Sequence, residues 1–168
     1  LEILEIKAAP ITDSCLPAFR DIPALLELQL EDVNLTNHGL EEVGKLRKLE
    51  TLHIRCRSVS DQGLVHFGSL AELRWLDLSG TCVTGDGLKH LRSLENLYWL
   101  NLRGTLLDDA GLEQLGGLVN LSLVELADNK IGDAGMAHLL RLANCKFLDL
   151  SNTEVTDAGL EVLVNLSS

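Results

Sequence analysis

Leucines and other apolar residues recur along this chain with a period of 24 residues. Seven consecutive units begin at residues 1, 25, 49, 73, 97, 121 and 145, with no insertion between them. When each unit is numbered from 1 to 24, positions 1, 4, 6, 11, 16, 19 and 22 are apolar in every unit, if Cys145 and Met136 are counted as apolar. A fixed period of this length predicts a solenoid, in which each unit packs only against its neighbours.

Two kinds of periodicity follow one another inside each unit. Apolar and polar residues alternate around positions 4 to 6, as in Leu76, Asp77 and Leu78, which predicts a strand with one buried face. Apolar residues at positions 16, 19 and 22 have the spacing of one helical face, and Thr or Asp at positions 12 and 13 is a typical helix cap. Position 9 is Thr or Asn in the last four units, where a short polar side chain can hydrogen-bond the backbone as the chain turns inward.

Stacking of the units accounts for the remaining features of the repeat. Position 15 is glycine in six units, although glycine early in a helix costs roughly 0.5–1 kcal/mol relative to alanine. Its recurrence therefore predicts a close approach to the neighbouring unit. Parallel strands stack about 4.8 Å apart whereas helices need about 10 Å, so the stack should curve with the strands inside. The sequence thus predicts one α/β domain over residues 1–168, a right-handed solenoid with a parallel strand ladder on its concave face and short helices on its convex face.

The pattern L-x-x-L-x-L-x-x-T/N-x-V-T-D-x-G-L-x-x-L-x-x-L resembles the leucine-rich repeat. The unit that begins at residue 73 matches it at Leu73, Leu76, Leu78, Thr81, Val83 and Leu88. The V-T-D-A-G-L form at 155–160 is similar to repeats common in bacterial proteins and to the cysteine-containing repeats of F-box proteins. The resemblance covers all seven units. It implies a protein-binding scaffold and does not identify a partner.

Composition narrows the classes of partner. The formal net charge of −11 disfavours nucleic acid and anionic membranes and favours basic partners, although solubility of a solenoid would also explain it. No apolar run approaches the roughly 18 residues of a membrane span. The four cysteines are scattered without zinc or disulfide spacing, which favours a reducing compartment such as the cytoplasm but leaves the localisation open. The chain begins and ends in phase with the repeat, without polar caps, so we expect it to be part of a longer protein.

An aromatic column is the main candidate for a functional site. Positions 3, 5 and 7 of each strand should point away from the core and line up across the stacked units. Position 3 is Trp75, Trp99, Leu123 and Phe147 in the last four units, and Tyr98 precedes Trp99. This predicts an apolar stripe on a face that should meet water, as is typical of protein-binding surfaces. The alternatives are that these side chains fold over the sheet edge or that a flanking element covers them.

A polar rim is expected beside the stripe, at positions 5 and 7. Its members in the last four units are Asp77, Asn101, Arg103, Glu125 and Asp149. Parallel pairing would bring Asp77 within reach of Arg55 or Arg103. The alternative is a solvated face whose charges only avoid like neighbours.

No catalytic, metal-binding or cofactor-binding residues are predicted. Asp77, His53 and Ser79 lie in neighbouring columns, but on an open and wet surface with nothing expected to shift their pKa values, so an enzyme is not expected. Three histidines share position 18 on the helical side without a converging column of carboxylates or thiols, which argues against a metal site.

Three functional hypotheses remain. The main one is a non-catalytic interaction module that binds a partner protein on the concave face of units four to seven. The second rests on the resemblance to F-box repeats and is a substrate-recognition arm of a larger enzyme, such as a ubiquitin-ligase adaptor or a bacterial effector. The third is a structural array that docks on a neighbouring domain or on a second copy, through the aromatic column or the open solenoid ends.

Overall fold

The computed structural model describes residues 1–164, so the predicted core residue Leu166 lies outside the described part of the chain. Each unit contributes one strand to a seven-stranded parallel sheet in sequence order. The strands are β1 (Ile3–Lys7), β2 (Glu27–Glu31), β3 (Thr51–Arg55), β4 (Trp75–Asp77), β5 (Trp99–Asn101), β6 (Leu123–Glu125) and β7 (Phe147–Asp149). Every pair in the register of adjacent strands joins residues 24 positions apart, as the sequence period requires.

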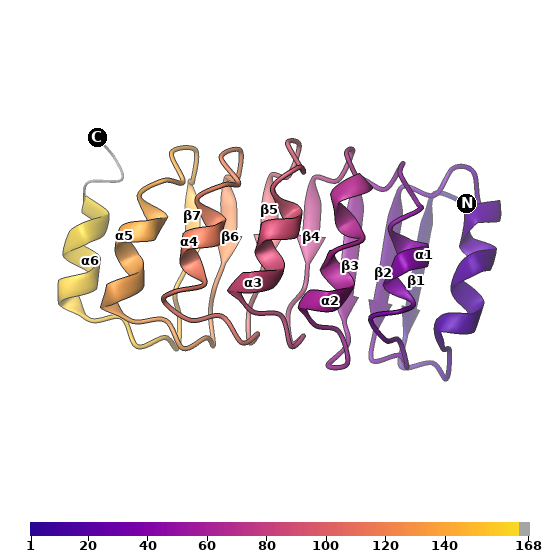
Figure 1. Cartoon of the computed structure of the whole chain (residues 1–168), viewed down its shortest axis with the longest axis horizontal. Coiled ribbons are helices and arrows are strands. Elements are labelled where there is room, and N and C mark those ends of the chain that lie inside the picture. The colour runs from indigo at the N-terminus through magenta and orange to yellow at the C-terminus, as the bar shows by residue number, and fades with distance from the viewer. Residues whose placement is uncertain (165–168) are drawn as a thin grey trace.

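The helices cover one side of this sheet, and the units follow one another along the long axis of the molecule (Figure 1). The α-helices are α1 (Leu40–Val43), α2 (Asp61–Leu64), α3 (Gly85–Leu88), α4 (Leu112–Leu115), α5 (Met136–Leu139) and α6 (Asp157–Leu163). The first unit has a 3-10 helix instead, Asp13–Asp21, which contains Pro17. Shorter 3-10 segments are Phe67–Ser69, Lys89–Leu91 and Asp133–Gly135. The open face of the sheet, away from the helices, is the concave face of the predicted solenoid.

The helices are shorter than the spacing of apolar residues suggests. α1 and α4 end before position 22, and Gly44 and Gly116 follow them directly. Glycine is a weak helix former. The leucines at position 22, such as Leu94 and Leu118, are still buried, but they reach the core from the turn that leads to the next strand.

Polar residues at position 9 make the turn after β4, β5, β6 and β7, as expected. The Thr81 hydroxyl donates to the Leu78 carbonyl at 2.6 Å, and the Asn129 amide donates to the Leu102 carbonyl at 2.7 Å. Position 8 adopts the left-handed backbone conformation in six units, at Ala8, Asp32, Gly80, Gly104, Asp128 and Asn152. In the third unit this position is Cys56, whose backbone is not left-handed and whose side chain is buried.

Contacts between successive helices explain positions 12, 13 and 15. Thr84 caps α3 by accepting from the Asp86 backbone N–H, as predicted for position 12. The prediction that Asp at position 13 also caps its own helix is wrong for Asp61, because its carboxylate accepts instead from the N–H of Thr84 at 2.8 Å and from the Thr84 hydroxyl at 2.7 Å. A Cβ on Gly87 would lie 2.4 Å from Asp61 Oδ1, so the predicted close approach at the repeated glycine is confirmed.

Candidate functional site

The aromatic column forms as a continuous stripe on the concave face. Trp75, Trp99, Leu123 and Phe147 are successive partners in the register of β4 to β7. The ring centroids of Trp75 and Trp99 are 5.8 Å apart, and Tyr98 lies 5.7 Å from Trp75. Tilted contacts at such distances are favourable beyond the area they bury. Trp75, Tyr98 and Trp99 thus form one packed cluster.

Much of this stripe is exposed to solvent. Trp75 is 39% exposed, Tyr98 38% and Phe147 49%, whereas Trp99 and Leu123 are half-buried. The Trp99 indole N–H donates to Glu125 Oε1 at 3.1 Å, which fixes the orientation of the ring. The stripe therefore combines exposed apolar surface with restrained side chains.

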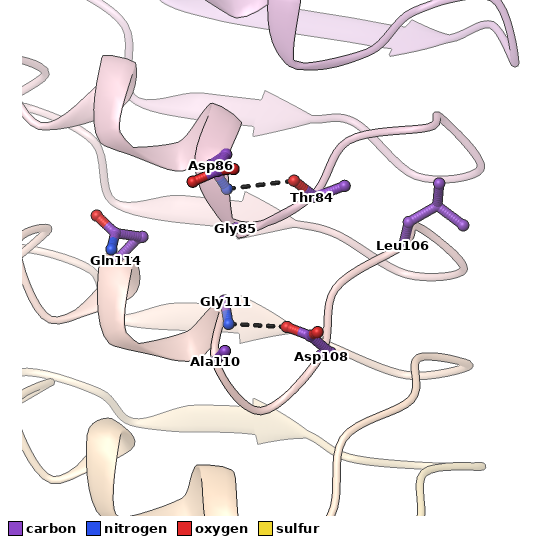
Figure 2. A pocket seen from close by; sticks show the side chains of 8 residues that line it. All are labelled: Thr84, Gly85, Asp86, Leu106, Asp108, Ala110, Gly111 and Gln114. Carbon is purple, nitrogen blue, oxygen red and sulfur yellow. Dashed lines mark hydrogen bonds between the residues drawn. The ribbon is translucent and has the colours of Figure 1, made fainter.

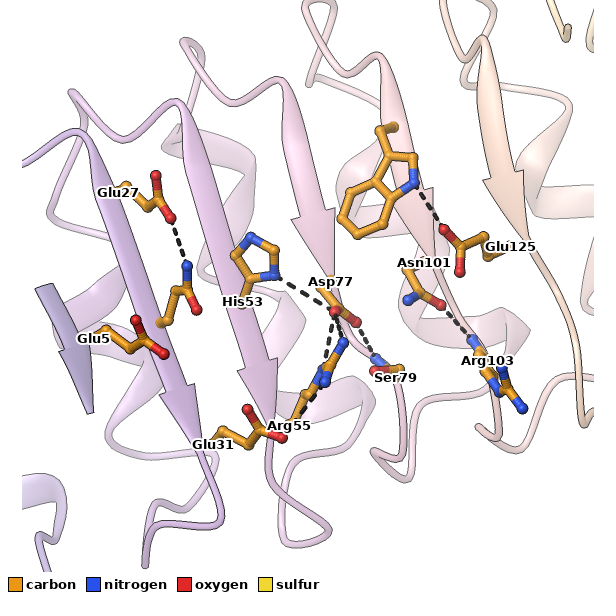
Figure 3. Close-up of polar contacts among 12 residues, drawn as sticks. Glu5, Glu27, Glu31, His53, Arg55, Asp77, Ser79, Asn101, Arg103 and Glu125 are labelled. Atoms are coloured by element: carbon orange, nitrogen blue, oxygen red, sulfur yellow. Dashed lines mark hydrogen bonds and ion pairs between the residues drawn. The ribbon is translucent and has the colours of Figure 1, made fainter. Parts of the chain in front are cut away.

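Asp77 differs from the expectation, because its side chain is fully buried. Arg55 donates to Asp77 Oδ2 from Nε at 3.0 Å and from Nη2 at 2.8 Å, and the Ser79 backbone N–H donates to Oδ1 at 2.8 Å (Figure 3). His53 Nδ1 lies 3.5 Å from Oδ2, and the His53 ring also contacts Trp99. The predicted pairing with Arg55 is present, but the expectation of an open and wet carboxylate is wrong.

This environment also corrects the expectation that nothing shifts the pKa of Asp77. Burial alone would raise the pKa of the carboxyl, since it disfavours the charged form. Hydrogen bonds from His53, Ser79 and Arg55 outweigh burial and lower the pKa from 3.8 to about 2. Asp77 is therefore a charged, fully bonded anchor under the concave surface.

The other predicted rim residues have separate surroundings. Asn101 is 5% exposed, and its side-chain oxygen accepts from the Arg103 backbone N–H at 2.9 Å. The Arg103 side chain pairs with Asp128 at 2.7 Å and not with Asp77. Asp149 is half-buried and accepts from the backbone N–H and the hydroxyl of Ser151, and these bonds lower the pKa of its carboxyl. The structure therefore does not join these residues into one rim network.

Two residues of this surface were absent from the predicted site. His53 connects Asp77 to Trp99, and its place at position 5, one unit before Asp77, was visible in the sequence. Asp128 occupies position 8 and pairs with Arg103. Its backbone is left-handed, so the alternation of inward and outward side chains along a strand does not predict where it points. Arg57 is exposed and lines a cavity of about 320 Å³ beside Arg55 and Arg103.

A second hollow lies on the helical side, between the loops before α3 and α4 (Figure 2). Its volume is about 350 Å³, and it is lined by Thr84, Gly85, Asp86, Leu106, Asp108, Ala110, Gly111 and Gln114. Asp108 Oδ1 accepts from the Gly111 backbone N–H at 2.9 Å, so this carboxylate caps its own loop. The hollow lies at the junction where Gly85 stands in place of the usual position-13 carboxylate.

The structure brings His53, Asp77 and Ser79 together on the concave face. Asp77 accepts from both His53 and the Ser79 backbone N–H, and no hydrogen bond joins His53 to a hydroxyl in the part of the chain that the structure describes. Within residues 1–164, no group of three or more His, Cys, Asp or Glu side chains could hold a metal ion. None of the helices in this range is long and apolar enough to cross a bilayer.

Comparison with known proteins agrees with the geometry. A family model described as leucine-rich repeat matches residues 119–140 and 146–164. The crystal structure of internalin C2 from Listeria monocytogenes is 22% identical over 98% of this chain and 76% of that one, with a TM-score of 0.64. The internalin inlF structure from the same organism is 17% identical, with a TM-score of 0.65, and this chain covers 51% of its length. Identities this low show a shared fold alone.

A search of functionally characterised proteins finds no significant sequence match. The family model covers two units, and the same seven apolar positions recur in the other five. The sheet and helices form the same repeat solenoid as the two internalins. The chain therefore contains leucine-rich repeats and has the fold of a leucine-rich-repeat solenoid.

Proposed function

We propose that this protein is a non-catalytic interaction module that binds a partner protein on the concave face of units four to seven. Leucine-rich-repeat solenoids generally mediate protein–protein interaction and are typically not enzymes. The observation that carries the proposal is the continuous stripe from Trp75 to Phe147, which leaves aromatic side chains exposed on the open face of a sheet.

The properties of the stripe match those of interface anchors. Trp and Tyr are enriched among the residues that dominate binding energy, especially where they are held in place before binding. Trp99 is held by Glu125 and by contacts with Trp75 and His53. In this proposal Trp75, Trp99, Tyr98, Leu123 and Phe147 are the anchors, and Glu125, Asp149 and Arg103 form the polar surroundings. Asp77 and Asn101 act beneath the surface, because both are buried.

The same surface would serve a recognition arm of a larger enzyme, such as a ubiquitin-ligase adaptor or a bacterial effector. A catalytic or F-box domain in the same reading frame would establish that variant of the proposal. Neither variant assigns a catalytic role to His53, Asp77 or Ser79.

The test begins with a random displayed peptide library, from which peptides that bind the wild-type chain are selected. Fluorescein-labelled copies of the selected peptides are titrated against wild type and against the Trp75→Ala/Trp99→Ala double variant. We expect the double variant to bind at least about tenfold more weakly, because truncation of an aromatic anchor typically costs more than 1 kcal/mol.

Controls separate binding from folding. A Val65→Ala/Val119→Ala variant removes two exposed apolar side chains from outside the sheet and should bind as wild type does. Urea denaturation checks that each variant is folded. The single Trp75→Ala variant adds a milder test, since the Trp75 indole donates no hydrogen bond among the described residues. Equal affinities of wild type and the tryptophan variants would refute the assignment of the site.

A further inference from the structure

The charges on the concave face are compensated unevenly. Its cations at positions 3, 5 and 7 are all paired: Lys7 lies 2.6 Å from Glu5, Arg55 bonds Asp77, and Arg103 bonds Asp128. By contrast, no cation lies within ion-pair distance of Glu27, Glu125 or Asp149 in the part of the chain that is described. The charges at these positions that lack an ion pair are therefore carboxylates. Arg103 still attracts the Asp149 carboxylate at longer range and helps to lower its pKa.

Two of these carboxylates are neighbours beside the aromatic stripe. Glu125 and Asp149 are direct partners in the register of β6 and β7. Like charges in such positions repel each other and destabilise a sheet. The alternative that charges on this face only avoid like neighbours is therefore wrong at this pair. Lys146 comes just before β7, and Asp149 is its last residue. At the usual rise of a strand, these two residues are about 10 Å apart along the chain.

Apolar surface borders the same pair. Leu123 and Phe147 are two residues before Glu125 and Asp149 in their strands, and so lie on the same face of the sheet. Trp99 is the register partner of Leu123, and its indole bond orients Glu125. A long basic side chain suits such a surface, since its aliphatic stem can pack on apolar groups while its charge meets carboxylates. Exposed aromatic faces also attract cations.

From the exposed aromatic stripe and the carboxylates without an ion pair beside it, we propose that the protein partner is a basic segment. An Arg or Lys side chain of this segment packs across Leu123, Phe147 and Trp99 and places its charge between Glu125 and Asp149. The net charge of −11 would also steer a basic segment to the protein. This inference rests on the proposed function and specifies the chemistry of its partner.

The test uses charge substitutions on both sides of the interface. Peptides from the library selection are compared with copies in which every Arg and Lys is replaced by Gln. Each form is titrated against wild type, the Glu125→Gln/Asp149→Asn variant, and a Glu113→Gln/Glu161→Gln control that removes the same charge from exposed helical positions.

We expect the selected peptides to be enriched in Arg and Lys. Replacement by Gln should weaken binding to wild type and to the helical control by roughly three- to tenfold, with a much smaller effect on Glu125→Gln/Asp149→Asn. Binding to wild type should also weaken as salt increases.

Other outcomes discriminate this inference from the proposed function. The basic partner would be overturned if the selected peptides lack basic residues, or if Gln substitution weakens binding equally to all three proteins. If binding in that case still depends on Trp75 and Trp99, the proposed binding face stands. Peptides indifferent to the tryptophans, or no enrichment at all, would count against both. Sedimentation at several protein concentrations tests for self-association of the chain. If the chain self-associates and the Trp75→Ala/Trp99→Ala variant does not, the face binds a second copy and the basic segment is rejected.

Discussion

The carboxylate of Asp77 has no exposed surface, although its position in β4 points away from the leucine core. Its neighbours provide the cover and the hydrogen bonds. Arg55 donates to it twice, the Ser79 backbone N–H donates once, and His53 lies within ion-pair distance. A buried charge is tolerated when it is paired and fully bonded. The same bonds hold His53 against Trp99, so Asp77 supports the aromatic cluster from below.

Replacement of Asp77 by Ala should therefore lower the free energy of unfolding by about 2–3 kcal/mol, because the Ser79 N–H and the Arg55 guanidinium lose their acceptor. Urea denaturation at pH 7 measures this change. Asp149→Ala is the matched control, since Asp149 occupies the same position and bonds the backbone N–H two residues on. It is only half-buried, and no arginine among the described residues forms an ion pair with it. A loss no greater at Asp77 than at Asp149 would contradict the role assigned to burial and to Arg55.

The lowered pKa of Asp77 also predicts a dependence of stability on pH. The folded state holds this pKa at about 2 and the unfolded state near 3.8, so the unfolded chain binds the proton more readily. The charged carboxylate thus stabilises the fold by roughly 2 kcal/mol above pH 4, and this contribution is lost as the pH falls from about 4 to about 2. The difference in unfolding free energy between wild type and Asp77→Asn, measured in urea from pH 7 to pH 2.5, should shrink across that window. A difference independent of pH would refute the prediction.

At the scale of elements, a carboxylate or amide at position 13 joins each unit to the next. Asp13, Asn37, Asp61, Asp109 and Asp133 all accept from the backbone N–H at position 12 of the following unit. The junction of the fourth and fifth units is the exception, because Gly85 has no side chain to offer. Asp108 stands there where the consensus has Thr, and a second carboxylate beside it would be repelled. The two departures from the repeat are therefore consistent with each other.

Restoring the consensus should thus have opposite effects at two glycines. A Cβ on Gly85 would lie 2.1 Å from the Gly111 Cα, so Gly85→Asp should destabilise the protein by more than about 1 kcal/mol. A Cβ on Gly132 would meet Asp109 at 3.5 Å, an ordinary contact, and its backbone is extended. Gly132→Thr should therefore stabilise by about 0.5–1 kcal/mol, through lower entropy of the unfolded chain and a new hydroxyl donor for Asp109. Thermal unfolding of both variants measures the two effects, and a stabilising Gly85→Asp would contradict this account of the junction.

The sequence predicted the elements more fully than the site. The register of the sheet, the buried leucines, the turn at position 9 and the role of the repeated glycine all follow from a strict period, because each unit repeats the same contacts. The burial of Asp77 and the pairing of Arg103 with Asp128 do not. They depend on how long side chains from three units arrange around one another and on the left-handed backbone at position 8, which a pattern of apolar and polar residues does not encode.

At the scale of the whole molecule, burial changes along the solenoid. The strand leucines Leu76 and Leu100 are completely buried, since a neighbouring unit covers them on each side. Their counterparts Leu4 and Leu148 are only partly buried, and Leu160 is 50% exposed. A solenoid is stabilised by the interfaces between adjacent units. Opening a terminal unit breaks one such interface, whereas opening a central unit breaks two.

Hydrogen exchange should reveal this gradient in three bonds of the same geometry. The position-6 amides of Leu78, Leu102 and Leu126 each donate to the next strand, at 2.9, 2.8 and 2.9 Å. Leu126 should exchange fastest, because its acceptor, the Asp149 carbonyl, belongs to the terminal strand β7, and Leu78 should exchange slowest. The three residues share position, burial and bond length, so differences in exchange between them report on the place of the unit in the array. Equal protection of all three amides would mean that the seven units open together, and the solenoid would then behave as one cooperative block.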